Sequence, residues 1–403
     1  MVRYWMHGEF GITSKSALAS VVLISNALIW YSFAFNILTS ILNETAIIMW
    51  ITHFGAAILS ALAGAAMADR THKRTAFLVC WMLLGIISSF IRILVNSKST
   101  LDVWAISLLF GASFGLGLPA SMGYFADCTH IENRAKLGGV ILCINGLGAF
   151  LLGIITVDDI ILQALTLAIW RGCGLAIFLI IRPPRGNEEK HQSVSFTSIL
   201  GQKSFTLYFI PWIMFSLITY LSLPVQLNIL EPNLVNLFSI VESALAGIFA
   251  IVGGFLSDII GRKRVAITGF IMLGLGYAML GIYPENLASW YFYTIVDGIA
   301  WGTFYVIFIM TIWGDLSFES SSNKYYALGG LPYFISNFLR LLIGSFVSEN
   351  VSPYAIFSLT AFFLFLAVIP LMYAPETLPE KKIKERELKG YIEKAKKVKE
   401  KYA

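Results

Sequence analysis

The chain has 403 residues, of which 57% are hydrophobic and only 13% are charged, with a formal net charge of +5. Ordinary soluble domains are roughly 45–50% apolar and about 25% charged, so this chain has too little polar surface to stay dispersed in water. The composition excludes a soluble enzyme, a nucleic-acid-binding protein, a disordered chain and a disulfide-stapled secreted domain. A multi-span membrane protein remains, in which every backbone polar group is satisfied within a helix or a closed barrel.

Uninterrupted apolar stretches of about 20–25 residues recur along the chain, and this is the length of a helix that crosses the hydrocarbon layer. Strands of a membrane barrel are shorter, with about ten residues of alternating polarity. We therefore predict an all-α membrane protein with twelve spans, in chain order at residues 16–42, 44–68, 75–96, 101–126, 135–156, 159–182, 204–228, 234–257, 264–283, 288–313, 325–349 and 352–374.

The segment between the sixth and seventh spans is rich in proline, glycine and charge, which predicts a linker at 183–203. This linker separates an N-terminal six-helix bundle at 1–182 from a C-terminal six-helix bundle at 204–375. A basic tail follows at 376–403, expected to be an amphipathic helix on anionic lipid or a solvated segment.

The distribution of lysine and arginine predicts the orientation, because these residues accumulate in cytoplasmic loops. With both termini in the cytoplasm, the inner segments hold 25 of the 29 basic residues. We expect a multi-pass protein of the cell membrane.

Two of the predicted cytoplasmic loops resemble each other. The sequence GAAMADRTHKR at 64–74 precedes the third span, and GGFLSDIIGRKR at 253–264 precedes the ninth. Their aspartates, Asp69 and Asp258, are separated by 189 residues, which is close to half the chain. Internal repeats of this kind are typical of transporters built from two related halves.

The fourth and tenth spans also match. They carry glycines four residues apart, end in Asp127 and Asp315, and are followed by Arg134 and Lys324. Acidic residues at helix C-termini and basic residues at helix N-termini oppose the helix dipole, so these charges need partners elsewhere. We predict that they form a cytoplasmic latch, with a solvated loop as the alternative. The predicted latch comprises Gly64, Asp69, Arg70, Lys73, Arg74, Asp127, Arg134, Gly254, Asp258, Gly261, Arg262, Lys263 and Asp315.

The spacing Gly254-x-x-x-Asp258-x-x-Gly261-Arg262-Lys263 resembles the loop signature of the major facilitator superfamily. The first copy departs from it, because Ala65 and His72 stand where the signature has glycine. The segment Pro375-Glu376-Thr377-Leu378 is similar to a motif of the sugar porters. The resemblance implies two pseudo-symmetric six-helix bundles that rock about a central site by alternating access.

Three ionisable residues inside predicted spans are candidates for the transport path, because such groups are expensive in a membrane unless they serve a function. Asp297 has Trp301 and Tyr305 on the same helical face, which suits a polyol, a cation or a proton; structural pairing is the alternative. Glu242 and His53 each lie 16 residues before the loop aspartate of their half and are candidate proton carriers. For His53 the alternative is a hydrogen-bonded core histidine.

Arg340 shares a helical face with Asn337 and is expected either to contact an anionic solute or to neutralise Asp297 or Glu242. Asn26 and Trp30 stand four residues apart in the first span, and an amide–aromatic lining suits a sugar. Packing is the alternative for any aromatic residue here, since aromatics are 14% of the chain.

The sequence contains no nucleotide-binding loop, metal-spaced cluster or nucleophile triad, so we expect no enzyme activity, no cofactor and no metal. The predicted function is secondary active transport of a sugar, organic acid or related metabolite, coupled to protons. The alternatives are a drug or metabolite efflux antiporter and a non-transporting sensor on the same fold. The expected partners are the solute, protons and the lipid bilayer, without nucleic acid, and the expected state is a monomer.

Overall fold

The computed structural model describes residues 14–42, 46–71, 73–94, 99–154, 159–182, 194–317 and 320–378. Eleven segments of this part are long and apolar enough to cross a membrane, and α6 occupies the place of the predicted fifth span. The turn residue His72, the linker residues 183–193 and the tail from 379 lie outside the described residues.

The long helices follow the predicted spans within a few residues. In the N-terminal half they are α2 (Ser14–Ile41), α3 (Ile47–Thr71), α4 (Arg74–Leu94), α5 (Thr100–Cys128), α6 (Arg134–Ile154) and α7 (Ile160–Ile181). In the C-terminal half they are α9 (Lys203–Ile229), α10 (Pro232–Ile260), α11 (Arg262–Ile282), α12 (Leu287–Phe304), α14 (Ser322–Asn350) and α15 (Pro353–Tyr373). Short elements complete the described chain: η1 (Ile131–Asn133), α8 (Phe196–Leu200), η2 (Tyr305–Thr311) and α13 (Ile312–Leu316).

Polar side chains start several of these helices on the face opposite the predicted latch. The Asp159 carboxylate accepts a hydrogen bond from the Leu162 amide at 2.8 Å, and the Asn286 side chain accepts from the Ala288 amide at 2.9 Å. Such caps satisfy amides that have no partner within the helix. The caps thereby fix the first turn of α7 and of α12.

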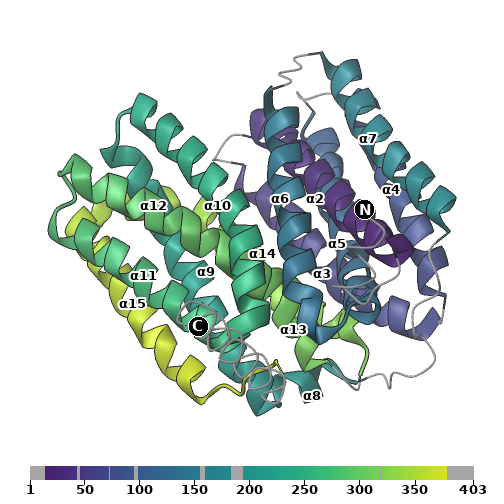
Figure 1. Cartoon of the computed structure of the whole chain (residues 1–403). Coiled ribbons are helices and arrows are strands. Elements are labelled where there is room, and N and C mark those ends of the chain that lie inside the picture. Colours follow the sequence, from purple (N-terminus) through teal and green to yellow (C-terminus); the bar gives the residue numbers. More distant parts are fainter. Residues whose placement is uncertain are drawn as a thin grey trace, which may run out of the picture.

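The two halves lie side by side and meet along two helix pairs (Figure 1). Helix α6 packs on α10, and α3 packs on α14. These contacts are equivalent, because α3 and α6 are the second and fifth spans of one half whereas α10 and α14 are the second and fifth of the other. Within each half, the second span packs on the fourth and the third packs on the sixth. The molecule consists of two pseudo-symmetric six-helix bundles, as predicted.

Repeated glycines allow the closest approach within each half. A Cβ atom at Gly111 or Gly115 of α5 would collide with the backbone oxygens of His53 or Ala57 on α3. In the second half, Gly298 and Gly302 of α12 approach the backbone of α10 at Glu242 and Ala246 in the same way. Small residues permit such contacts between membrane helices, and the matched pattern places His53 and Glu242 at equivalent positions.

The predicted tenth span departs from a regular α-helix. It consists of α12, the π-helical segment η2 and α13. The wider turn frees carbonyl groups, and side chains bond to them: the Thr311 hydroxyl donates to the Val306 oxygen at 2.7 Å, and the Trp313 indole donates to the Phe308 oxygen. Irregular turns of this kind are frequent at functional sites.

The packing of α3 on α5 generates a test of the fold. A Cβ at Gly64 would collide with the Leu116 carbonyl, whereas a Cβ at Gly55 of the same helix would meet nothing within 4 Å. We expect Gly64→Ala to destabilise the protein by about 1–3 kcal/mol, as overpacking does. Gly55→Ala should be neutral or stabilise by up to about 1 kcal/mol through helix propensity. Thermal unfolding of the purified variants in one detergent measures the difference, and equal melting temperatures would contradict the packing.

Candidate functional site

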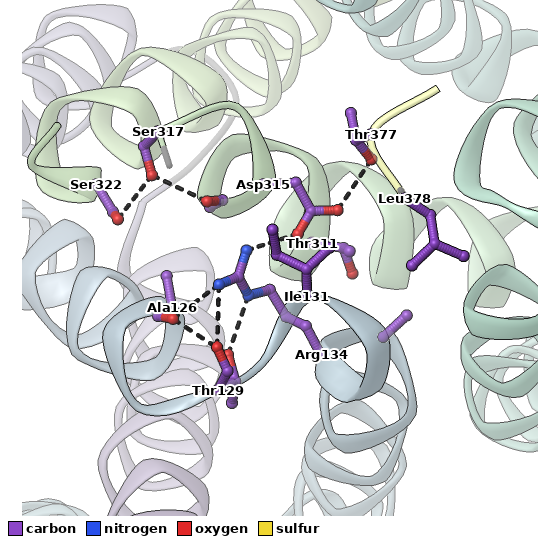
Figure 2. A network of polar contacts seen from close by, with 12 residues as sticks. Ala126, Thr129, Ile131, Arg134, Thr311, Asp315, Ser317, Ser322, Thr377 and Leu378 are labelled. Atoms are coloured by element: carbon purple, nitrogen blue, oxygen red, sulfur yellow. Dashed lines mark hydrogen bonds and ion pairs between the residues drawn. The ribbon is translucent and has the colours of Figure 1, made fainter. Parts of the chain in front are cut away.

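Asp315, at the C-terminal end of the tenth span, is shared by arginines from both halves. Its Oδ1 accepts from Arg134 Nη1 at 2.5 Å, and its Oδ2 accepts from Arg262 Nε at 3.1 Å. Arg134 also donates to the carbonyls of Ala126 and Thr129, so the guanidinium is held in place from its own half (Figure 2). The carboxylate of Asp315 thereby joins the two bundles.

The second signature loop forms a continuous part of this network. Arg262 pairs with Asp258 at 2.8 Å and is fully buried. The Asp258 carboxylate accepts hydrogen bonds from the backbone amides of Ala135 at 3.3 Å and Lys136 at 2.8 Å. An anion at a helix N-terminus is favoured by the helix dipole and by free amides. The end of α10 is thus bound to the start of α6 in the other half.

The first signature loop makes the equivalent contact with the start of α14. Asp69 accepts from Asn323 Nδ2 at 2.8 Å, from Lys324 Nζ at 3.2 Å and from the Ser321 hydroxyl. Arg74 pairs with Asp127, as Arg262 pairs with Asp315. The structure therefore pairs the repeated charges in three groups at one end of the molecule, which we call together the latch: Asp69, Arg74, Asp127, Arg134, Asp258, Arg262, Asp315 and Lys324.

Not every predicted latch residue belongs to these groups. The side chains of Arg70 and Lys73 are exposed. Lys263 is half-buried and donates its ammonium to the Met372 carbonyl at 2.6 Å. Gly64 and Gly254 act by close packing, since a Cβ at either position would collide with a backbone carbonyl of a neighbouring helix.

The segment after the last span closes over the latch. The Glu376 carboxylate accepts from the amides of Arg262 at 2.8 Å and Lys263 at 3.1 Å, which caps α11. Thr377 donates to Asp315 at 2.9 Å (Figure 2). Gly261 has φ +102°, a conformation that favours glycine, and a Cβ there would strike the Glu376 carboxylate. The predicted turn glycine is therefore required on two counts.

Two adjoining cavities lie between the halves and share Leu142, Asn145, Ser243 and Tyr305 in their walls. The first has a volume of about 330 Å³ and is lined mainly by α6, α9, α10 and α12. The second has a volume of about 460 Å³ and is lined mainly by aromatic side chains and small residues, among them Tyr31, Phe114, Trp212 and Tyr333. We call them the carboxyl cavity and the aromatic cavity.

Glu242 and Asp297 both line the carboxyl cavity, from α10 and α12, and the Glu242 backbone lies against Gly298, the residue after Asp297. Asp297 is 2% exposed, and its Oδ1 has no hydrogen-bond partner. Trp301 and Tyr305 line the same cavity, as their spacing predicts. The sequence predicts a transport role for all four, and the structure places them in the wall of one cavity.

A hydroxyl–amide network supports this cavity from the side of α9 and α11. Gln226 Nε2 donates to the hydroxyls of Tyr277 and Tyr293, each at 3.1 Å, and the two hydroxyls are 3.0 Å apart. Ser222 lies 3.0 Å from the Tyr277 hydroxyl. Tyr293 also neighbours Asp297. These bonds fix the Tyr293 ring beside the carboxyl pair and occupy the Gln226 amide.

Other predicted path residues lie elsewhere. Asn26 and Trp30 line neither cavity, because the face of α2 that carries them is turned into the N-terminal bundle. Asn26 donates to the Trp170 carbonyl at 2.7 Å and accepts from Arg171 at 2.9 Å, while the Trp30 indole donates to Ser89 at 2.9 Å. Arg171, which had no predicted role, is 1% exposed, with its guanidinium 4.2 Å from the ring centroid of Trp81.

His53 is fully buried, with Nδ1 3.1 Å from the Ser107 carbonyl and Nε2 3.0 Å from the Tyr31 hydroxyl. It reaches the aromatic cavity only through Tyr31. Arg340 lines neither cavity; its Nε donates to Asn337 Oδ1 at 3.2 Å, and it forms no ion pair with Glu242 or Asp297. The expected neutralisation of these carboxyls by Arg340 is therefore not seen.

Within the described residues, no group of three or more His, Cys, Asp or Glu side chains could hold a metal ion. The fold defines a membrane protein of two related helical bundles with cavities between them. A family model described as Major Facilitator Superfamily matches residues 194–400, just over half of the 403 residues. The chain belongs to the major facilitator superfamily, whose members carry small solutes across membranes.

Solved structures of the same fold cover nearly the whole chain. The proton:xylose symporter XylE bound to 6-bromo-6-deoxy-D-glucose has a TM-score of 0.69 at 14% identity, over 90% of this chain and 96% of that one. The Escherichia coli fucose:proton symporter FucP has a TM-score of 0.67 at 9% identity, over 90% and 98%. A bacterial homologue of the iron transporter ferroportin in the outward-facing state has a TM-score of 0.69 at 12% identity, over 89% and 98%. No curated protein sequence matches the chain.

The shared carboxylate of Asp315 leads to a test of the latch. Asp315→Asn removes the charge from two buried arginines, and loss of one partner of a buried pair costs about 3–5 kcal/mol. We expect the halves to separate at the latch in a population at least tenfold larger than in the wild type. Electron–electron distance measurements between spin labels at the exposed positions Lys73 and Thr268, in a cysteine-free background, report the separation. Glu349→Gln, an exposed carboxyl outside the latch, is the control, and an unchanged distance distribution in Asp315→Asn would refute the role of the latch.

Proposed function

We propose that the protein is a secondary active transporter that moves a small solute by alternating access and couples its movement to protons. The observation that carries this proposal is the pair of neighbouring carboxyls, Glu242 and Asp297, in a cavity between the two halves. Two carboxylates this close repel each other strongly in a medium of low dielectric constant. A proton bound between them relieves the repulsion, so the pair is suited to take up and release protons.

The position of the pair supports a coupling role. Asp297 lies on the tenth span, which continues through η2 to Asp315 in the latch. Glu242 lies on α10, which ends in the latch at Asp258. Both members of the pair therefore stand on helices that also carry latch residues. A proton that alters the contact between α10 and α12 acts on the elements that close the path at the predicted cytoplasmic face.

The aromatic cavity is proposed as part of the solute site, because residues of both halves line it. It adjoins the carboxyl cavity through Asn145, Ser243 and Tyr305, so solute and proton would occupy neighbouring positions. Two proteins of similar structure, a proton:xylose symporter and a fucose:proton symporter, couple solute movement to protons, which supports the proposal. Efflux in exchange for protons is the alternative direction on the same residues.

Infrared spectroscopy of the purified protein tests the proton site without a known solute. We expect the wild type at neutral pH to show a carboxylic-acid C=O band that Asp297→Asn and Glu242→Gln each remove or shift, because each substitution breaks the carboxyl pair. Glu285→Gln, which alters an exposed carboxyl between α11 and α12, should leave the band unchanged. If the spectra of Asp297→Asn and the wild type are identical, the pair does not hold a proton.

Transport in proteoliposomes tests the coupling itself. A ligand-stabilisation screen of sugars, organic acids and amines supplies the solute, since a compound that binds the native state raises its melting temperature. We expect Asp297→Asn to lose accumulation driven by a pH gradient and to keep solute exchange across the vesicle membrane. Glu285→Gln again serves as control. Undiminished accumulation by Asp297→Asn would remove the coupling role.

A further inference from the structure

The carboxyl cavity contains buried oxygen atoms that make no hydrogen bond with the described residues. They are Asn145 Oδ1 on α6, Thr219 Oγ1 on α9 and Asp297 Oδ1 on α12. A buried polar atom without a partner is unfavourable. All three residues line one cavity, and they come from both halves of the molecule. The Asn145 oxygen and a carboxylate oxygen of Asp297 accept hydrogen bonds, and the Thr219 hydroxyl accepts or donates, so a ligand that donates hydrogen bonds can satisfy all three.

The charges of the lining point the same way. Glu242 and Asp297 are the ionisable carboxyls in the wall, and none of the described residues that line the cavity is a lysine, an arginine or a histidine. Arg340, on α14, donates to Asn337 and lies outside both cavity walls. An organic acid would meet repulsion from the carboxyls with no basic group to offset it. The lining thus disfavours an anionic solute.

Aromatic rings complete the wall. Tyr220, Tyr293, Trp301 and Tyr305 line the cavity, with Trp301 and Tyr305 ring centroids 5.0 Å apart and Tyr220 and Trp301 centroids 6.2 Å apart. The faces of such rings attract cations. Sugar hydroxyls donate and accept hydrogen bonds, and the wall offers donors to them from Asn145, Ser243 and the tyrosines, so hydrogen bonding alone does not separate a sugar from an amine. The two carboxyls and the ring faces favour the amine, because both attract a positive charge.

We propose that the carboxyl cavity binds a small protonated amine, which enters in exchange for the proton held by Glu242 and Asp297. This inference rests on the proposed function and names its solute class. One monocation enters as one proton leaves, so the net charge of the site is unchanged. The ammonium group donates to the unpartnered oxygens, and the aromatic rings cover the organic part of the solute.

Among the described residues, no side chain that faces the carboxyl pair from a neighbouring element carries a charge that changes near pH 7, so the exchange of proton for amine involves the pair alone. The titratable side chains that face it from the packed elements are phenols, which stay neutral near pH 7: Tyr220 on α9, Tyr277 on α11, Tyr293 on α12 and Tyr305 on η2. Helix α6 contributes Asn145 to the cavity wall, and its side chain is neutral. Competition between protons and amine is therefore a property of Glu242 and Asp297.

Three compounds that share a phenyl ring but differ in charge test the proposal: benzylamine is a cation, benzyl alcohol is neutral and benzoate is an anion. Binding to the full-length protein in lipid nanodiscs is measured by calorimetry. We expect benzylamine to bind at least tenfold more tightly than the other two. Its affinity should rise between about pH 6 and about pH 8, by up to about tenfold per pH unit while one proton is displaced per amine. Benzylamine itself stays protonated over this range, as alkylamines do.

Variants locate the site. Asp297→Asn should weaken benzylamine binding at least tenfold and abolish its pH dependence. Thr219→Val keeps the shape of the side chain and removes the hydroxyl. It should weaken benzylamine binding without altering the pH dependence. Glu285→Gln should bind as the wild type does. The proposal is overturned if benzylamine does not bind, if benzyl alcohol or benzoate binds as tightly, or if benzylamine binding is independent of pH.

The failure of this inference is distinguishable from failure of the proposed function. If benzyl alcohol binds best while the carboxylic-acid band is lost in Asp297→Asn, the proton site stands and the amine class is wrong. If the band is unaffected, the coupling site itself is wrong, whatever the probes do.

Discussion

Charge buried between the two halves is the constraint on which the closed end of the molecule depends. Removing an ion from water costs several kcal/mol, and only a well-placed partner offsets this. Asp315 has both of its arginine partners only while the halves are in contact, because Arg262 belongs to its own half and Arg134 to the other. Asp69 depends in the same way on the start of α14, and Asp258 on the start of α6. The bundles therefore cannot part at this end without new partners for several charges at once.

The fold and the latch were predictable from the sequence because their signals are local or repeated. The span length follows from the apolar run, and the matched loops around Asp69 and Asp258 identify the two halves. A charge at the unfavourable end of its own helix also requires a partner, and in the structure Arg74 pairs with Asp127 and Arg262 with Asp315. Arg70 and Lys73 show the limit of this reasoning, because a run of basic residues does not reveal which of them faces inward.

The cavity walls were only partly predictable, because the rotation of a helix about its axis is determined by packing against its neighbours. Asp297 stood out as a charge inside a span, and the four-residue steps to Trp301 and Tyr305 placed them beside it. Asn26 and Trp30 have the same spacing, yet they point into the N-terminal bundle, where they bond to Trp170 of α7 and Ser89 of α4. Asn145 and Thr219 went unnoticed since a single uncharged polar residue in an apolar span carries no signal of its own.

The π-helical segment between Asp297 and Asp315 has a consequence for the chain that connects them. In an α-helix each residue turns the chain by about 100°, whereas hydrogen bonds of the i→i+5 type place more residues in each turn. Residues 305–311 thus change the angular phase between the two aspartates, one of which faces a cavity and the other an arginine pair. Deletion of one residue from this segment would rotate one end of the span relative to the other. Asp297 and Asp315 would then no longer both face their present neighbours, although both side chains were retained. The number of residues in the π-helical segment therefore determines the rotation of Asp297 relative to Asp315 about the axis of the span.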